Sequence, residues 1–335
     1  MAEKVLVTGG LGYIGSHTVV ELMAQGFEVV IIDNLSNTRE DVLDRIAQIT
    51  GQKPVYYNGD VCDATDLEKI FAEHSDITSV IHFAAYKAVG KSVEKPLEYY
   101  RNNVGGMITL LGQMKKANIE RIVFSSSCTV YGDTDRSPVD ESSPIAQAAS
   151  PYGNTKIICE DILRDESVAS SLSVVSLRYF NPIGAHPSAL IGELPLGVPN
   201  NLVPYITQTA AGIREQLTVF GEDYNTADGT CIRDYIHVMD LAKAHVIALQ
   251  RFGKMDDRFE VFNLGTGNGN SVLEVVQTFE KVSGTKLNYR IGPRRAGDVE
   301  QIWASTAKAN DVLGWKAESS LEEMLRTAWA WQQTL

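Results

Sequence analysis

A glycine-rich turn between two apolar runs near the start of the chain restricts the fold more than any other feature. Val5-Leu6-Val7 is followed by Thr8-Gly9-Gly10-Leu11-Gly12-Tyr13-Ile14-Gly15. Apolar residues then recur at helical spacing as far as Met23, and residues 27–32 form a second apolar run that ends at Asp33. This order of strand, glycine turn, helix, strand and acid predicts a βαβ unit that binds a dinucleotide.

The glycines and the acid of this unit each have a chemical reason. Glycine lets backbone amides approach a pyrophosphate at the start of a helix, where the helix dipole favours negative charge. Asp33 follows the last glycine at the spacing suited to binding ribose hydroxyls. Because a carboxylate there would repel a 2′-phosphate, we expect NAD rather than NADP.

Strands and helices continue to alternate as far as about residue 180. Further strands are predicted at residues 55–57, 79–83, 121–124 and 173–180, with helices between them that include a long one at 96–117. The alternation predicts an α/β protein with a doubly wound parallel Rossmann sheet. Pro, Gly and Asn become dense at 182–201, so we expect an NAD-binding domain at 1–180, rejoined by 238–264, and a smaller α/β substrate domain at 181–335.

Composition and charge argue against several classes of protein. The chain has 335 residues and a net charge of −12, which disfavours a nucleic-acid or anionic-membrane surface. Its cysteines, Cys62, Cys128, Cys159 and Cys231, lack metal-ligand spacing. No apolar run reaches the roughly 18 residues that a membrane span needs. We therefore expect a cytoplasmic protein without a metal site.

A second motif places a phenol and an ammonium four residues apart. Ser150 is a good N-cap and Pro151 a good first helical residue, so Tyr152 and Lys156 would share one face of a helix. An ammonium about 4 Å from the phenol oxygen contributes about 4 kcal/mol in a half-buried site, which would lower the pKa of Tyr152 from about 10 toward 7. Tyr152 could then act as a general base. Because a Tyr and a Lys at this spacing also occur together by chance, the pair supports a catalytic role only in combination with the glycine motif.

These motifs together resemble the extended short-chain dehydrogenase/reductase family, whose Ser is matched by the run that ends at Ser127. Within that family, four further segments are similar to the UDP-glucose 4-epimerase family: Ile81-His82-Phe83-Ala84, Val130-Tyr131-Gly132, Arg178-Tyr179-Phe180-Asn181-Pro182 and Arg233-Asp234-Tyr235-Ile236-His237-Val238. The similarity extends from Lys4 to about Trp331.

The resemblance implies a role for each matching residue. Ser127, Tyr152 and Lys156 would be catalytic. Residues that would bind NAD are Gly9, Gly12, Tyr13, Ile14, Gly15, Asp33, Asn34, Asn37, Asp60, Val61, Phe83, Lys87, Asn102, Tyr152, Lys156 and Tyr179. Residues that would bind a UDP-sugar are Ser127, Tyr152, Asn181, Asn201, Leu202, Thr218, Phe220, Arg233, Arg295, Asp298 and Ile302.

Without the resemblance, several of these residues have ordinary explanations. Asp60 could equally begin a turn, and Lys87 could be a surface charge. Phe220 fits a hydrophobic core by spacing, and Arg295 fits a surface ion pair. The resemblance favours the binding roles.

The implied reaction interconverts UDP-galactose and UDP-glucose through a 4-keto sugar. Ile302 occupies a wall position that is large in some members of the family and small in others, so acceptance of N-acetylated UDP-sugars stays open as an alternative. A 4,6-dehydratase is disfavoured because Cys128 and Thr129 stand where an acid pair is needed. A non-catalytic NAD sensor is disfavoured by the presence of all three catalytic residues. The family also implies a homodimer formed by helices at 96–117 and 151–171.

Overall fold

The computed structural model describes residues 3–134, 136–295 and 298–335 and contains two compact units. The first comprises Met1–Gly132, Pro144–Arg178 and Ala242–Phe262. The second comprises Asp133–Ser143, Tyr179–Leu241 and Asn263–Leu335. The chain passes between them several times, so neither unit is one continuous stretch of sequence.

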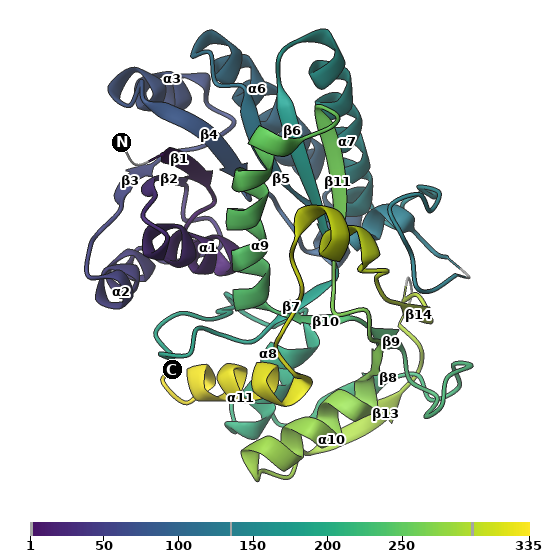
Figure 1. Ribbon diagram of the computed structural model, residues 1–335. Coiled ribbons are helices and arrows are strands. Elements are labelled where there is room, and N and C mark those ends of the chain that lie inside the picture. Colours follow the sequence, from purple (N-terminus) through teal and green to yellow (C-terminus); the bar gives the residue numbers. More distant parts are fainter. Residues whose placement is uncertain (1–2, 135, 296–297) are drawn as a thin grey trace. The chain divides into compact units, whose positions relative to one another are not determined.

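A seven-stranded sheet forms the centre of the first unit, with strand order β11-β6-β5-β4-β1-β2-β3 (Figure 1). β1 pairs in parallel with β2 and β4, and β2–β3 and β4–β5 are also parallel. The order reverses between β1 and β4, which is where doubly wound sheets hold ligands. The predicted fold class is therefore confirmed. The strands are β1 (Lys4–Thr8), β2 (Glu28–Asp33), β3 (Val55–Asn58), β4 (Ile77–His82), β5 (Arg121–Ser127), β6 (Ser173–Tyr179) and β11 (Phe259–Leu264).

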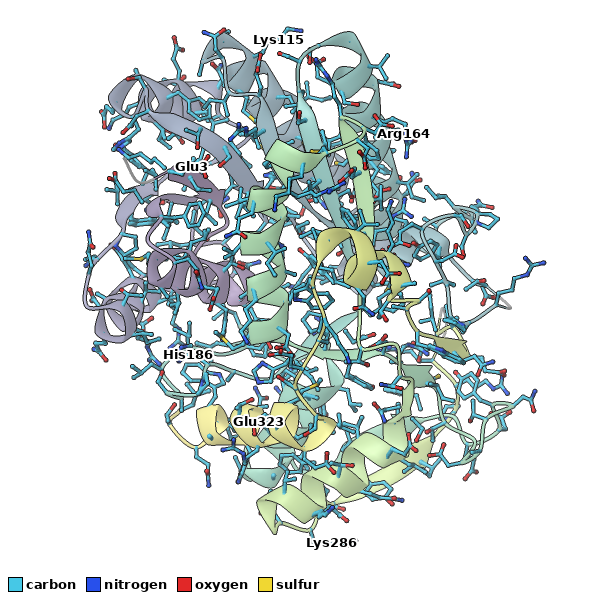
Figure 2. The ribbon with its side chains drawn as sticks, viewed as in Figure 1. Glu3, Lys115, Arg164, His186, Lys286 and Glu323 are labelled. Carbon is cyan, nitrogen blue, oxygen red and sulfur yellow. The ribbon has the colours of Figure 1, made fainter. Side chains whose placement is uncertain are left out.

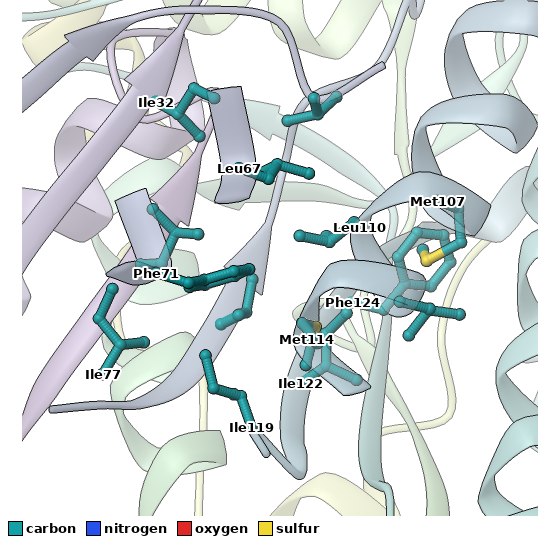
Figure 3. Close-up of a cluster of buried hydrophobic side chains, with 14 of the residues drawn as sticks. Ile32, Leu67, Phe71, Ile77, Met107, Leu110, Met114, Ile119, Ile122 and Phe124 are labelled. Atoms are coloured by element: carbon teal, nitrogen blue, oxygen red, sulfur yellow. The ribbon is translucent and has the colours of Figure 1, made fainter. Parts of the chain in front are cut away.

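Helices cover both faces of this sheet because its strands are apolar on both sides. Leu6, Val30 and Ile32 point to one face and pack with α3 (Ala64–Glu73), α6 (Gly106–Lys116) and α7 (Pro151–Ala169) in a hydrophobic cluster, most of which Figure 3 shows. The intervening residues Val7 and Ile31 lie under the glycine turn on the other face. That face carries α1 (Tyr13–Ala24) and α9 (Val238–Arg251) (Figure 1). The remaining helices are α2 (Asp41–Thr50), α4 (Val89–Glu94) and α5 (Pro96–Tyr99).

The long helix predicted at 96–117 differs from the prediction in one respect. α5 and α6 are joined by a π-helical turn, Tyr100–Gly105, so the stretch is not uniformly α-helical. Asn103, in this turn, is buried and uses its side chain to bind a neighbouring loop and α7. π turns of this kind occur often at functional sites.

In the part of the second unit that the structure describes, small sheets are packed with helices. β7 (Asn181–Ile183) pairs with β10 (Tyr235–His237), and β8 (Leu217–Phe220) pairs with β13 (Tyr289–Gly292). β9 (Ile232–Arg233) lies between β12 (Asn270–Ser271) and β14 (Gln301–Ile302). α8 (Leu202–Ala210), α10 (Val272–Ser283) and α11 (Leu321–Gln332) contribute to one hydrophobic cluster. A short helical turn at Ala309–Leu313 also belongs to this unit, whereas those at Cys128–Tyr131 and Phe252–Lys254 belong to the first unit.

Charged side chains such as Lys115 of α6, Arg164 of α7 and Lys286, which lies between α10 and β13, project outward (Figure 2). Within the described ranges, no helix combines the length and apolar character needed to cross a membrane. That part of the chain also lacks a cluster of three His, Cys, Asp or Glu side chains placed to hold a metal ion.

Asp234 holds three loops of the second unit together from a fully buried position. Its carboxylate accepts hydrogen bonds from the backbone N–H groups of Thr266, Gly267 and Ala304 at 2.8, 3.1 and 3.1 Å. Burial raises the pKa of Asp234, and these bonds oppose that shift. The bonds fix the segments that flank Arg233 and β14.

Replacing Asp234 by Ala should destabilise the protein strongly because several buried amides lose their acceptor. We expect the free energy of unfolding to fall by about 3–5 kcal/mol, measured by urea unfolding. Asp223→Ala is the matched control, since that carboxylate is exposed beside Arg294 at 2.8 Å and should contribute nothing measurable. Equal losses from the two substitutions would contradict this assignment.

Candidate active site

The glycine turn after β1 is shaped for close approach of a ligand to the backbone. Gly9 has φ +69°, and a Cβ there would lie 2.8 Å from the backbone nitrogen of Ala84. A Cβ on Gly15 would overlap the carbonyl oxygen of Gly9. α1 begins after Gly12, which has no side chain to cap the helix, and its first turn contains no acidic residue. These amides therefore suit an anionic group such as a pyrophosphate.

Asp33 joins the end of β2 to this turn. Its carboxylate is buried and accepts hydrogen bonds from the amides of Leu11 at 3.1 Å and Leu35 at 3.0 Å. Burial raises the pKa of Asp33, and the amides oppose the rise. A carboxylate held at this edge of the sheet fits the ribose of a dinucleotide and disfavours a 2′-phosphate, as the sequence predicts.

Most of the other predicted cofactor residues lie in the loops that follow β2, β3 and β4. The Nδ2 atom of Asn34 lies 3.3 Å from the Oδ2 atom of Asp60, which brings the ends of β2 and β3 together. The Nζ atom of Lys87 lies 5.9 Å from the centre of the Tyr13 ring. The remaining positions are Ile14 in α1, exposed Asn37 after β2, buried Val61 after β3, Phe83 after β4, Asn102 in the π turn and Tyr179 at the end of β6.

Ser127, Tyr152 and Lys156 converge where α7 begins beside the end of β5. The Oγ atom of Ser150 accepts a bond from the amide of Gly153 at 3.2 Å, and Pro151 is the first helical residue, so the predicted helix start is confirmed. The hydroxyl of Ser127 is close enough to the phenol of Tyr152 to lower the pKa of that phenol. The Nζ atom of Lys156 lies 5.9 Å from the centre of the Tyr152 ring and donates to the carbonyl oxygen of Ser125 at 2.5 Å.

The predicted fall in the Tyr152 pKa is not found in this geometry. Burial raises the pKa of Tyr152 to about 12, although the nearby hydroxyl of Ser127 opposes the rise. The pKa of Lys156 falls to about 8 because its ammonium is buried. The prediction was wrong because it assigned the ammonium to the phenol oxygen, whereas the ammonium donates to the carbonyl of Ser125.

Two residues at this site were not predicted from the sequence. His82 ends β4 and shares a 2.8 Å hydrogen bond with Thr8 at the end of β1, at the point where the strand order reverses. Asn103 donates to the carbonyl of Tyr86 and to the Oγ1 atom of Thr155, both at 3.0 Å, and so ties the loop after β4 to α7. A histidine inside an apolar strand was a usable signal for His82. Asn103 had none, because helical asparagines are usually exposed.

In the second unit, Asp298 brings two predicted arginines together. Its Oδ1 atom lies 2.7 Å from the Nη2 atom of Arg295 and 3.9 Å from the Nη2 atom of Arg233. The guanidinium of Arg295 also lies 5.7 Å from the centre of the Phe220 ring. Two arginine forks beside an aromatic ring can bind phosphate oxygens and stack a base.

The other predicted substrate residues of this unit lie on its strands β14, β8 and β7 and at the start of α8. Ile302 is buried and pairs with Arg233 between β14 and β9. Thr218, on the same strand as Phe220, accepts a bond from Arg290 at 3.3 Å. Asn201, which precedes α8 at Leu202, donates to Glu193 at 2.7 Å. Asn181 begins β7, and its backbone N–H donates to the carbonyl oxygen of Asp234 at 2.9 Å.

Comparison with known proteins identifies the family. The family model for GDP-mannose 4,6 dehydratase matches residues 6–328. The UDP-glucose 4-epimerase of Haemophilus influenzae is 52% identical over 330 residues, which cover 98% of this chain and 97% of that protein. The chain belongs to the UDP-glucose 4-epimerase family. The resemblance drawn from the motifs is thus confirmed.

Solved structures of UDP-glucose 4-epimerases have the same fold. One from Stenotrophomonas maltophila, with bound NAD and formylated UDP-arabinopyranose, matches with a TM-score of 0.96 and 49% identity, covering 99% of this chain and 98% of that one. One from Bifidobacterium longum, in complex with NAD+ and UDP, matches with a TM-score of 0.94 and 48% identity, with the same coverage.

The buried His82 should make the stability of this epimerase-family chain depend on pH. Burial and the charge of Lys156 lower the pKa of His82 from 6.5 to about 3. Below pH 6.5 the unfolded chain therefore binds a proton that the folded chain excludes, so stability is present above 6.5 and is lost as pH falls. The loss is about 1.4 kcal/mol per pH unit for one proton.

His82→Asn should flatten this dependence, since Asn keeps a polar partner for Thr8 but does not titrate. Urea unfolding at pH 5.0, 5.5, 6.0 and 6.5 (roughly the range in which one histidine proton dominates) gives the slope for both proteins. Identical slopes would show that His82 is protonated as readily in the folded chain as in the unfolded one.

Proposed function

We propose that this chain interconverts UDP-galactose and UDP-glucose by removing and returning hydride at C4 of the sugar, with NAD as a bound cofactor. The observation that carries the proposal is the convergence of Ser127, Tyr152 and Lys156 at the carboxyl edge of a dinucleotide-type sheet. The glycine turn and Asp33 fit NAD. The relatives named above are epimerases, and two of them carry NAD.

Tyr152 exchanges the proton of the sugar 4-hydroxyl in this proposal. Its phenolate accepts the proton as the 4-keto sugar forms, and its phenol returns the proton when the ketone is reduced. Ser127 favours the phenolate, since it lowers the pKa of Tyr152, and its hydroxyl can also donate to the sugar oxygen. NAD, when bound, would supply the hydride acceptor, and its positively charged ring would favour an ionised phenol.

Lys156 supplies a second positive charge near the phenol. Its ammonium is anchored by the carbonyl of Ser125 at 2.5 Å, and two of its three donors are left for other partners. We infer that it binds the ribose of the nicotinamide half, the role implied by the family resemblance.

The second unit is proposed to hold the UDP group. Arg233 and Arg295 would bind the diphosphate, and Phe220 would stack on uracil. Hydride must return to the opposite face of the ketone, so the sugar has to turn while the nucleotide stays bound. The first domain, 1–180 with 238–264, is accordingly proposed to hold NAD, and residues 181–335 the nucleotide sugar.

A dehydratase is the nearest alternative, and the name of the matching family model makes it worth weighing. Elimination of water needs an acid beside the serine. Cys128 and Thr129 follow Ser127 in this chain, and neither protonates a leaving hydroxyl well. We therefore favour epimerisation.

Tyr152→Phe tests the proposal because it removes only the phenol oxygen. We expect kcat with UDP-galactose to fall at least about a hundredfold, while NAD released from the denatured protein stays near one per chain. Tyr57→Phe is the matched control: its phenol pKa is also raised to about 12 by burial, but it bonds to Glu73 on α3. Full activity in the Tyr152→Phe protein would contradict the proposed mechanism.

We also propose a homodimer formed through α5, α6 and α7. Large apolar side chains on these helices are exposed, with Leu97 at 79%, Ile108 at 56% and Val168 at 84%. α7 packs against α5 and the π turn, so the three helices form one surface. Exposed apolar area of this kind is usual at an interface between copies.

Leu97→Asp should weaken the dimer by placing a charge in its interface. Sedimentation velocity at micromolar concentration should give a dimer for the wild type and more monomer for the variant. Ile213→Asp, at a position 61% exposed in the second unit, should leave the dimer intact. A wild-type monomer would defeat this proposal.

A cytoplasmic location is consistent with the state of the cysteines. Within the described part of the chain, no disulfide joins Cys62, Cys128, Cys159 or Cys231. Reduced thiols persist in the cytosol, where glutathione and thioredoxin maintain them.

A further inference from the structure

An ion pair that the proposed mechanism does not use lies under the catalytic residues. Glu160 of α7 and Arg178 of β6 have side chains exposed by 0% and 2%. Arg178 donates to both carboxylate oxygens, from Nε to Oε1 at 2.9 Å and from Nη2 to Oε2 at 2.5 Å. Two charges buried this deeply are tolerated only with such complete pairing.

Both members of this ion pair form further hydrogen bonds with neighbouring segments of the first unit. The Oε1 atom of Glu160 also accepts from the hydroxyl of Ser126 at 2.6 Å and from that of Ser176 at 2.9 Å. Arg178 donates from Nη1 to the hydroxyl of Tyr131 at 3.0 Å. One carboxylate therefore fastens α7 to both β5 and β6.

The position of Glu160 along α7 connects it to the chemistry. Tyr152, Lys156 and Glu160 are spaced four residues apart, so they follow one face of the helix. Opposite them on β5, consecutive serines meet all three: Ser127 lies beside Tyr152 and lowers the pKa of its phenol, the carbonyl of Ser125 accepts from Lys156, and Ser126 donates to Glu160. The bond from Ser126 is thus the one contact among the three that involves no catalytic side chain.

We propose that Glu160 is a positioning residue that, through Ser126, fixes the end of β5 against α7 so that Ser127 and the Ser125 carbonyl stay aligned with Tyr152 and Lys156. This inference rests on the proposed function. It predicts that a hydrogen bond with no substrate contact controls the rate of the chemical step, because small displacements of catalytic groups slow reactions strongly.

The charge of Glu160 supports the same role. Burial lowers the pKa of Lys156 to about 8, while Glu160 and Cys159 raise it. The other groups near the ammonium are Tyr152, His82 of β4 and Phe124 of β5. Glu160 therefore helps to keep Lys156 protonated as well as in place.

Two serines provide a matched test, because each donates one bond to the same carboxylate oxygen and both are buried, at 1% and 0% exposure. Only Ser126 belongs to the strand that ends in Ser127. Ser126→Ala and Ser176→Ala each leave Glu160 bonded to Arg178 and to the other serine, so both proteins should fold. We expect a similar fall in Tm for the two, about 2–4 °C.

The proposal predicts that kcat separates the two variants. With UDP-galactose, kcat of Ser126→Ala should fall about tenfold, with KM and the NAD content per chain unchanged, whereas kcat of Ser176→Ala should stay within about twofold of wild type. Equal values of kcat for the two variants would overturn the proposal. An inactive wild type would instead refute the proposed function, so the two failures are distinguishable.

Discussion

The burial of the Lys156 ammonium is the constraint on which the site depends. A charge removed from water needs compensating partners, and here they are the carbonyl of Ser125 and the carboxylate of Glu160 one helical turn away. Glu160 in turn needs Arg178, which is also buried. These requirements fix α7 against β5 and β6, because sliding the helix by one residue would leave charges unpaired inside the protein. The geometry of the proposed catalytic residues is thus set by the need to pair buried charges as much as by hydrophobic packing.

The fold was largely predictable because its signals are local. The apolar run at Val5-Leu6-Val7, the glycines before α1 and Asp33 after β2 each act within a few residues of their position. Ser150 and Pro151 mark the start of α7 for the same reason. The prediction was incomplete where contacts between residues far apart in the sequence determine the backbone conformation. The π turn around Asn103 depends on bonds to Tyr86 and Thr155, which spacing along the chain cannot reveal.

The ionisation of the site was harder to predict than its residues. Helical spacing placed Tyr152 and Lys156 on one face of α7, and the structure agrees. Spacing carries no information about burial, however, and burial raises the pKa of the phenol and lowers that of the ammonium. The sign of a pKa shift follows from the competition between desolvation and charge. Desolvation is the larger effect here, so the chain's own groups do not give a phenolate at neutral pH.

The two arginines predicted to bind phosphate in the second unit carry like charges that must be held close together. Arg233 and Arg295 would repel each other without Asp298, which lies between them and leaves the trio with a net charge of +1. A diphosphate brings about two negative charges, so its attraction to the arginines must outweigh its repulsion from the aspartate. The side chain of Arg295 is 55% exposed and Phe220 is 39% exposed, whereas Lys156 is 3% exposed. In the proposed function, the nucleotide would therefore meet groups such as Arg295 and Phe220 that water still reaches, and the proton and hydride chemistry would use groups held in the interior. That division suits a reaction in which the sugar must turn while its nucleotide remains bound.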